Sequence, residues 1–216
     1  MMIELKIAQL LCSRLCHDLV GAASAINAGL EMIEGEPNEM SGPLGLMNTS
    51  AAQMTRRLAF YRVAFGLAEG ARGMASVDEI RKLAGDFFSA GKVTLNWPDT
   101  ASHTGVSLLS AEAAKVCLNL LLMASASLPR GGILTLHFSR IPEGVGIVLD
   151  AVGQGVGISE ETAAGLDPQA GIDRVNVHNV HVFLARTLAQ SVGGEIECRA
   201  NSDGVSVQIA CLFPNA

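Results

Sequence analysis

The chain has little charge and no excess of basic residues. Only 17% of its 216 residues are charged, and 15 Lys and Arg against 21 Asp and Glu give a formal net charge of −6. Nucleic acids and anionic membranes favour a basic protein surface, so the charge argues against either as the main partner. A protein partner or a small ligand fits this composition better.

The cysteines and the apolar runs exclude further classes. The five cysteines contain no CxxC pair and their number is odd, which favours a reducing cytosol and gives no support to a disulfide framework, a metal site or a redox site. No segment approaches the roughly 18 apolar residues that span a bilayer, and the N-terminus does not read as a signal peptide. We therefore expect a soluble, cytoplasmic protein. With 49% hydrophobic residues, it can bury a substantial core.

A helical periodicity runs from about Ile3 to Ile33 and gives this segment one apolar side. At about 100° per residue, the apolar sector comprises Leu11, Leu15, Leu19, Ala22, Ile26, Leu30 and Ile33. His17 points almost opposite the centre of this sector, so its imidazole should face water. The residues on its side are small or polar: Ser13, Val20, Gly21, Ser24 and Asn27. This arrangement predicts a nucleophile that a flat partner surface can reach.

A second helix should follow the helix-stopping residues 35–38. Its apolar positions are spaced three and four apart, at Leu44, Met47, Ala51, Met54, Leu58, Tyr61 and Phe65. Two antiparallel helices cannot enclose two apolar stripes by themselves. We therefore expect a homodimer in which two hairpins form a four-helix bundle.

The glycine-rich residues 66–75 mark a boundary between a helical hairpin at residues 1–70 and a second domain at residues 71–216. Ser76 and Glu79 have the spacing of a capping box, which predicts a helix toward Ala90. Further strands and helices are expected, with strands at 93–97, 133–138, 145–151, 195–200 and 205–212 and helices at 111–129 and 179–192. This order predicts an α+β protein with helices on one face of a mixed sheet.

His17 followed by Asp18 on the first helix of a hairpin, before an α/β sandwich, resembles the core of sensor histidine kinases. Residues 17–21 match that family's H-[ED]-x-x-x motif, so the resemblance implies that a ring nitrogen of His17 carries a phosphoryl group and that the second domain is an ATPase-like sandwich. The nucleotide motifs are degenerate. Met123 stands where the family has the asparagine that holds Mg²⁺, and Gly153 where it has the aspartate that binds adenine. Residues 179–182 replace a glycine-rich box with bulkier side chains.

A histidine hairpin joined to a degenerate sandwich is similar to the ChpT-type histidine phosphotransferases of alphaproteobacteria. The run LCSRLCHDLVG at residues 11–21 matches their opening motif. The resemblance implies a carrier that accepts a phosphoryl group on His17 from the receiver domain of a hybrid histidine kinase. It would pass the group to the aspartate of response regulators that control the cell cycle or development, without binding ATP.

The positions of the neighbours of His17 on the helix predict their roles in this transfer. Asp18 would orient the imidazole, and Arg14, one turn earlier, would steady phosphate oxygens. The receiver would dock on Ser13, Val20, Gly21 and Ser24. No cofactor or metal is implied in this chain, because the receiver supplies the Mg²⁺.

Two alternatives remain open from the residues. One is an ATP-dependent histidine kinase with an atypical nucleotide site, and the other is a non-catalytic dimer that binds response regulators. Nucleotide titration addresses the first. Receiver binding that is unchanged in His17→Ala, with no phosphoryl transfer by the wild type, would favour the second. His178 and His181 lie three apart, but no third metal ligand follows them, so we expect a structural role.

Overall fold

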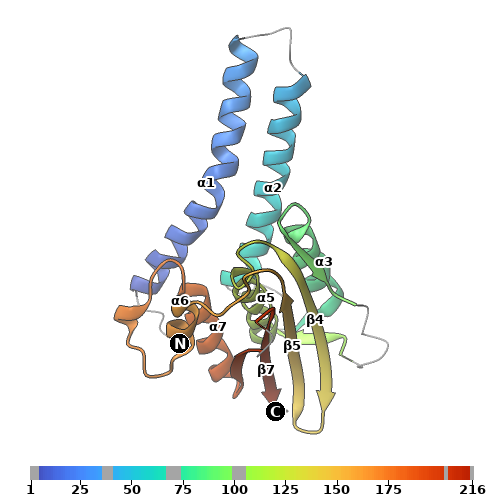
Figure 1. Cartoon of the computed structure of the whole chain (residues 1–216), viewed down its shortest axis with the longest axis vertical. Helices are drawn as coiled ribbons and strands as arrows, with labels where there is room; N and C mark the ends of the chain where they lie inside the picture. The colour runs from blue at the N-terminus through green and yellow to red at the C-terminus, as the bar shows by residue number, and fades with distance from the viewer. Residues whose placement is uncertain (1–4, 36–40, 67–73, 99–105, 202–203, 215–216) are drawn as a thin grey trace.

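A pair of long helices stands on an α/β domain in the computed structural model, which describes residues 5–35, 41–66, 74–98, 106–201 and 204–214 (Figure 1). Helix α1 spans Leu5–Gly35 and α2 spans Ser41–Phe65, as the apolar periodicity predicts. The predicted stop at residues 36–38 lies outside the described residues. The division between residues 70 and 71 lies outside them as well.

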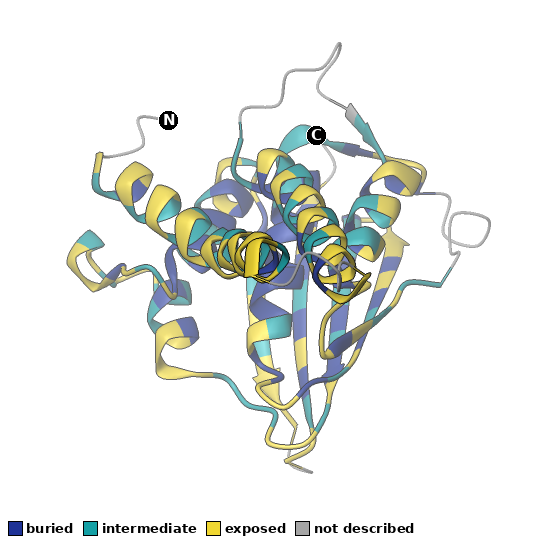
Figure 2. Ribbon diagram, turned by 90° about the horizontal axis from the view of Figure 1, so that it is seen from above, coloured by how far each residue is buried: buried dark blue, intermediate teal, exposed yellow. Residues whose placement is uncertain are grey.

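The two helices of the hairpin approach each other closely at Gly29 of α1, which has no side chain. A Cβ placed on Gly29 would lie 2.5 Å from Cγ of Met47, so the close packing depends on glycine at this position. Along α1 only Ile7, Ala22 and Gly29 are buried, and much of the hairpin surface is exposed (Figure 2). No described helix, α1 included, combines the length and the apolar character needed to cross a membrane.

The second domain contains a mixed five-stranded sheet in the order β2-β4-β5-β7-β6. Its strands are β2 (Val93–Asn96), β4 (Gly132–Ile141), β5 (Gly144–Val152), β6 (Glu195–Ala200) and β7 (Ser206–Pro214). Strands β2 and β4 are parallel and the other neighbours are antiparallel. Burial alternates along β4, where Leu134 and Leu136 are buried while Ile133 and His137 are exposed, so one face of the sheet packs on the core.

Three helices cover that face: α3 (Val77–Phe88), α5 (Ala111–Ala126) and α7 (Val180–Ser191). Helix α5 lies at the centre, between the sheet and α2, and nearly every residue from Ala113 to Ala124 is buried. A helix enclosed on all sides must be apolar all round, which explains the long hydrophobic run of this segment. The α+β architecture with helices on one face of a mixed sheet is confirmed.

The capping-box prediction is wrong in its chemistry. Ser76 occupies the N-cap position of α3, but its side chain makes no capping hydrogen bond. Ser76 belongs instead to the short strand β1 (Met74–Ser76), which pairs with β3 (Leu108–Ser110), and the backbone N–H of Val77 donates to the carbonyl of Ser107 at 3.0 Å. The pairing of β1 with β3 thus satisfies the N–H of Val77, whereas the expected hydrogen bond from the N–H of Glu79 to the Ser76 hydroxyl is not formed.

The segment between β5 and α7, for which the sequence predicts neither a helix nor a strand, contains local structure. It forms α6 (Glu160–Leu166) and a single 3-10 turn η1 (Ile172–Arg174). Helix α6 is capped by Ser159, whose side chain accepts from the N–H of Thr162. These two elements lie beside α7, on the side of the domain nearest to the base of α1 (Figure 1).

Candidate functional site

The imidazole of His17 faces solvent on α1. Its side chain is 77% exposed, in agreement with the position that helical periodicity predicts. The predicted docking residues Ser13, Val20, Gly21 and Ser24 are exposed as well. A Cβ added to Gly21 would meet no atom within 4 Å. The described residues around the imidazole therefore form an open surface, which a partner can approach.

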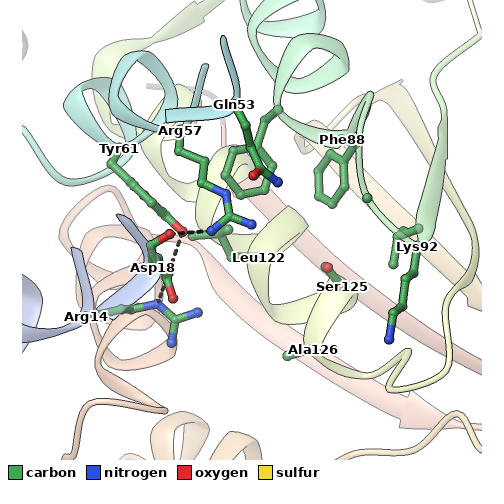
Figure 3. Close-up of a pocket in the computed structure, with 13 residues that line it drawn as sticks. Arg14, Asp18, Gln53, Arg57, Tyr61, Phe88, Lys92, Leu122, Ser125 and Ala126 are labelled. Atoms are coloured by element: carbon green, nitrogen blue, oxygen red, sulfur yellow. Dashed lines mark hydrogen bonds and ion pairs between the residues drawn. The ribbon is translucent and has the colours of Figure 1, made fainter. Parts of the chain in front are cut away.

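The carboxylate of Asp18 lies at the junction of α1 and α2. Its Oδ1 is 3.1 Å from Nδ1 of His17, and its Oδ2 accepts a hydrogen bond of 2.5 Å from the hydroxyl of Tyr61. Nε of Arg14 lies 3.8 Å from the same Oδ2. Arg57 of α2 donates to the backbone carbonyl of Asp18 (Figure 3). Asp18 thus contacts the predicted nucleophile on one side and the second helix on the other.

The ring of Tyr61 is held in an aromatic cluster. It stacks on Phe65 with 5.1 Å between ring centroids and meets the ring of Phe87, on α3, edge-on at 5.8 Å. Burial, together with the negative charge of Asp18, raises the pKa of Tyr61 far above its usual value. The phenol therefore stays protonated and acts as a hydrogen-bond donor to the carboxylate.

Arg14 connects α1 to the sandwich domain. Its Nη1 donates to the backbone carbonyls of Val177 and His178 at 3.2 and 3.3 Å, in the loop before α7. Nearer the N-terminus, Nζ of Lys6 donates to the carbonyl of Ile172 at 2.9 Å. The guanidinium of Arg14 therefore reaches the sandwich, and a contact between Arg14 and phosphate oxygens stays a prediction.

A small cleft of about 260 Å³ separates the hairpin from the sandwich beside this network. Arg14, Asp18 and Arg57 line its hairpin side, and Phe88, Lys92 and Ser125 are among the residues opposite (Figure 3). Three cationic side chains and one carboxylate thus face the cleft. Among the described residues, no group of three or more His, Cys, Asp and Glu side chains is placed to hold a metal ion.

The histidines of the α7 region differ in environment. His178 is exposed, whereas His181 is buried at the start of α7. Burial, with a smaller contribution from the nearby positive charge of Arg14, holds the pKa of His181 well below its usual value. His181 is therefore neutral near pH 7, and its position inside the domain fits the structural role expected from the sequence.

Sequence reasoning missed two site residues on α2. The sequence analysis places Tyr61 among the apolar positions of the second helix, which is correct for its ring but assigns no role to its hydroxyl. It does not single out Arg57. A usable signal existed for Tyr61: a buried tyrosine normally needs a hydrogen-bond partner, so a tyrosine at a seam position indicates a polar group nearby. The pairing with Asp18 depends on the packing of α1 against α2, which no local pattern specifies.

Comparison with known proteins identifies the family. Residues 77–204 match the family model of the histidine phosphotransferase C-terminal domain. The protein phosphotransferase ChpT of Brucella abortus (strain 2308) is 29% identical over 204 residues, which cover 93% of each chain. A solved structure of a bacterial phosphotransferase is 25% identical, with a TM-score of 0.81 over 98% of both chains. The chain therefore belongs to the histidine phosphotransferase family, as a ChpT-type phosphotransferase.

Proposed function

We propose that this protein is a phosphorelay carrier. His17 would accept a phosphoryl group from the receiver domain of a hybrid histidine kinase and pass it to the aspartate of response regulators. The observation that carries the proposal is the exposed imidazole of His17, whose Nδ1 lies 3.1 Å from a fixed carboxylate while the rest of the ring faces an open surface. Such a ring can be reached by a second protein and leaves one nitrogen free to react.

The chemistry suits an imidazole. A neutral ring nitrogen is nucleophilic near neutral pH, and the phosphoramidate that it forms stays activated for transfer to a carboxylate. Phosphoryl transfer depends mainly on positioning and on stabilisation of charge at the phosphoryl oxygens. The docked receiver would supply the aspartate and the Mg²⁺, while this chain would supply the oriented nucleophile and the docking surface around Gly21.

Three positions support transfer without ATP. Met123, at the position of the Mg²⁺-holding asparagine of the kinases, is fully buried in the core. Gly153 has no side chain that could bind an adenine, and a Cβ at this position would lie 2.6 Å from the carbonyl oxygen of Gly131. Asn179 uses its side chain within the loop, donating to the carbonyl of Arg174 at 3.1 Å. The packing of Met123 and Gly153 and the loop contact of Asn179 support the proposal that this chain transfers phosphoryl groups without ATP.

We also propose that the protein is a homodimer. An apolar groove, the hairpin groove, opens between α1 and α2 with a volume of about 990 Å³. Its lining includes Leu11, Leu15, Leu58, Ala59 and Phe65. A second copy placing its own hairpin here would cover this surface and complete a four-helix bundle. Receiver docking would then use the solvent-facing side of each α1.

A phosphotransfer assay tests the function. A receiver domain phosphorylated with labelled phosphate should transfer the label to the wild-type protein and to the His178→Ala variant, in which another exposed histidine is removed. The label should be absent from His17→Ala. Incubation with labelled ATP alone should leave the protein unlabelled.

Two results would contradict the proposal. Labelling of the pure protein by ATP would indicate a kinase with an atypical nucleotide site. Receiver binding that is equal in wild type and His17→Ala, without any transfer of label, would indicate a non-catalytic binding protein.

A further inference from the structure

Helix α2 reaches across the hairpin to the turn of α1 that holds the phosphoacceptor. The hydroxyl of Tyr61 donates a hydrogen bond of 2.5 Å to Oδ2 of Asp18, and Arg57 donates one to the backbone carbonyl of the same residue. The two α2 residues lie four positions apart and therefore on one face of that helix. Both the side chain and the backbone of Asp18 are thus bound by α2 (Figure 3).

The two oxygens of the carboxylate have different partners. Oδ1 lies 3.1 Å from Nδ1 of His17, and Oδ2 binds the Tyr61 hydroxyl and has Nε of Arg14 at 3.8 Å. The Asp18 side chain is only 21% exposed, whereas that of His17 is 77% exposed. The carboxylate is therefore fixed from inside the protein, and the imidazole is the one partner that extends into solvent.

This geometry selects a tautomer of His17. An ionised carboxylate can only accept hydrogen bonds, so the contact with Oδ1 requires a proton on Nδ1 of the imidazole. In the neutral ring the lone pair then resides on Nε2. A carboxylate that is free to rotate would lose this selectivity, because its orientation determines whether Oδ1 faces Nδ1.

We propose that Tyr61 is a positioning residue for phosphotransfer, which holds Asp18 so that His17 presents the lone pair of Nε2 to the receiver. This inference rests on the proposed function of His17. Tyr61 suits the task because its ring is fixed by Phe65 of α2 and Phe87 of α3, so its hydroxyl is placed by both the hairpin and the sandwich.

The transfer step balances without a further reactant. The Nε2 lone pair forms the N–P bond while the P–O bond to the receiver aspartate breaks, and the electron pair of that bond leaves with the aspartate carboxylate. The Nδ1 proton stays on the ring, where the hydrogen bond to Asp18 stabilises the positive charge that develops. In the reverse step, the N–P bond breaks and its electron pair returns to Nε2.

Tyr61→Phe is the decisive variant, because it removes the hydroxyl and retains the ring. Nitrogen NMR of the protein labelled with ¹⁵N-histidine, recorded where the imidazole is neutral, reports which ring nitrogen of His17 bears the proton. His17→Ala assigns the signals. Wild type should show mainly the Nδ1–H form, and Tyr61→Phe should shift toward the Nε2–H form. The saturated rate of transfer should fall about 10-fold, with the receiver concentration for half-saturation unchanged.

A matched pair of arginine variants extends the test. Arg57→Gln removes the contact with the backbone of Asp18 and should alter the His17 tautomer in the same direction. Arg56→Gln removes a neighbouring arginine that binds Ser89 instead, and it should leave both tautomer and rate unchanged. This pair separates fixation of Asp18 from a general loss of positive charge on α2.

The outcomes are decisive in either direction. An unchanged tautomer in Tyr61→Phe, or a changed tautomer with an unchanged transfer rate, would overturn the role of Tyr61. A lower rate with an unchanged tautomer would overturn it too, because Tyr61 would then act by another route. Wild-type protein that carries no phosphoryl group would refute the proposed function instead, and the tautomer measurement alone would then decide whether Tyr61 positions His17.

Discussion

At the scale of single residues, the burial of a neutral imidazole at His181 should lower the free energy of unfolding at acidic pH. Neither ring nitrogen has a hydrogen-bond partner among the described residues, and the pKa of His181 is held well below its usual value by burial and then by Arg14. An unfolded histidine has a pKa near 6.5. Below about pH 6.5, His181 therefore binds a proton in the unfolded chain but stays neutral in the folded chain.

The free energy of unfolding should consequently decrease as the pH falls below about 6.5, with a His181 contribution of up to about 1.4 kcal/mol per pH unit. This contribution ends where the folded-state pKa is reached. His181→Leu should have a shallower pH dependence than wild type. His178→Leu, which changes an exposed histidine, should keep the wild-type dependence. Urea unfolding between about pH 7.5 and 5 measures both, and equal slopes for wild type and His181→Leu would contradict the prediction.

Individual residues also show where sequence reasoning succeeds and where it stops. The exposure of His17 follows from helical periodicity alone, because a position opposite an apolar sector faces water in any packing of that helix. The hydrogen bond from Tyr61 to Asp18 joins residues that lie far apart in sequence, and it exists only because α1 and α2 pack in one register. Arg14 shows the same limit, since its acceptors belong to the loop at Val177 and His178.

At the scale of elements, the turn after β5 is tightly packed around Gly153. A Cβ on Gly153 would lie 2.6 Å from the Gly131 carbonyl oxygen and 2.8 Å from Cδ2 of Leu128. Gly153→Asp should therefore lower the free energy of unfolding by about 2 kcal/mol through overpacking. Gly157→Asp is the control, because a Cβ there meets no atom within 4 Å. Denaturant unfolding compares the two.

The same element can be tested for nucleotide binding. The pair Gly153→Asp and Met123→Asn restores the side chains that the kinase motifs contain, but the aspartate has no open space to enter and Met123 lies inside the core. Calorimetric titration with Mg-ATP should detect no binding by the double variant. Binding by this variant, or an unchanged stability of Gly153→Asp, would show that the pocket is open.

Elements differ in how well the sequence predicts them. The long helices α1, α2, α5 and α7 and the strands of the main sheet are predicted because their apolar spacing persists over many residues. The pair β1 and β3 is missed, since each strand has 3 residues and gains its structure from the other. Helix α6 is missed for a related reason: its 7 residues are too few to establish a period.

At the scale of the whole molecule, the hairpin has an apolar groove that the described part of the single chain leaves open. Leu58, which lines the hairpin groove, is 43% exposed in the single chain. If a second hairpin covers it, Leu58→Glu would bury a charge against an apolar surface and should weaken dimerisation at least about 10-fold. Leu108→Glu places the same charge at a leucine on β3 that is 53% exposed, and it should leave the dimer intact.

Sedimentation over a range of concentrations measures the effect. Wild type and Leu108→Glu should sediment as dimers, and Leu58→Glu should shift toward monomer. Wild type that remains monomeric at every concentration would contradict the proposed four-helix bundle, as would a Leu58→Glu variant that dimerises normally.

Both helices of the hairpin are fastened to the sandwich domain. Arg14 binds the loop before α7, and the side-chain amide of Asn119 on α5 donates to the carbonyl of Ala64 near the end of α2 at 2.9 Å. A swing of the sandwich about the hairpin would break both links at once and would withdraw Phe87 from Tyr61. The position of the Tyr61 ring, and through its hydroxyl that of the Asp18 carboxylate, therefore depends on how the two domains are joined.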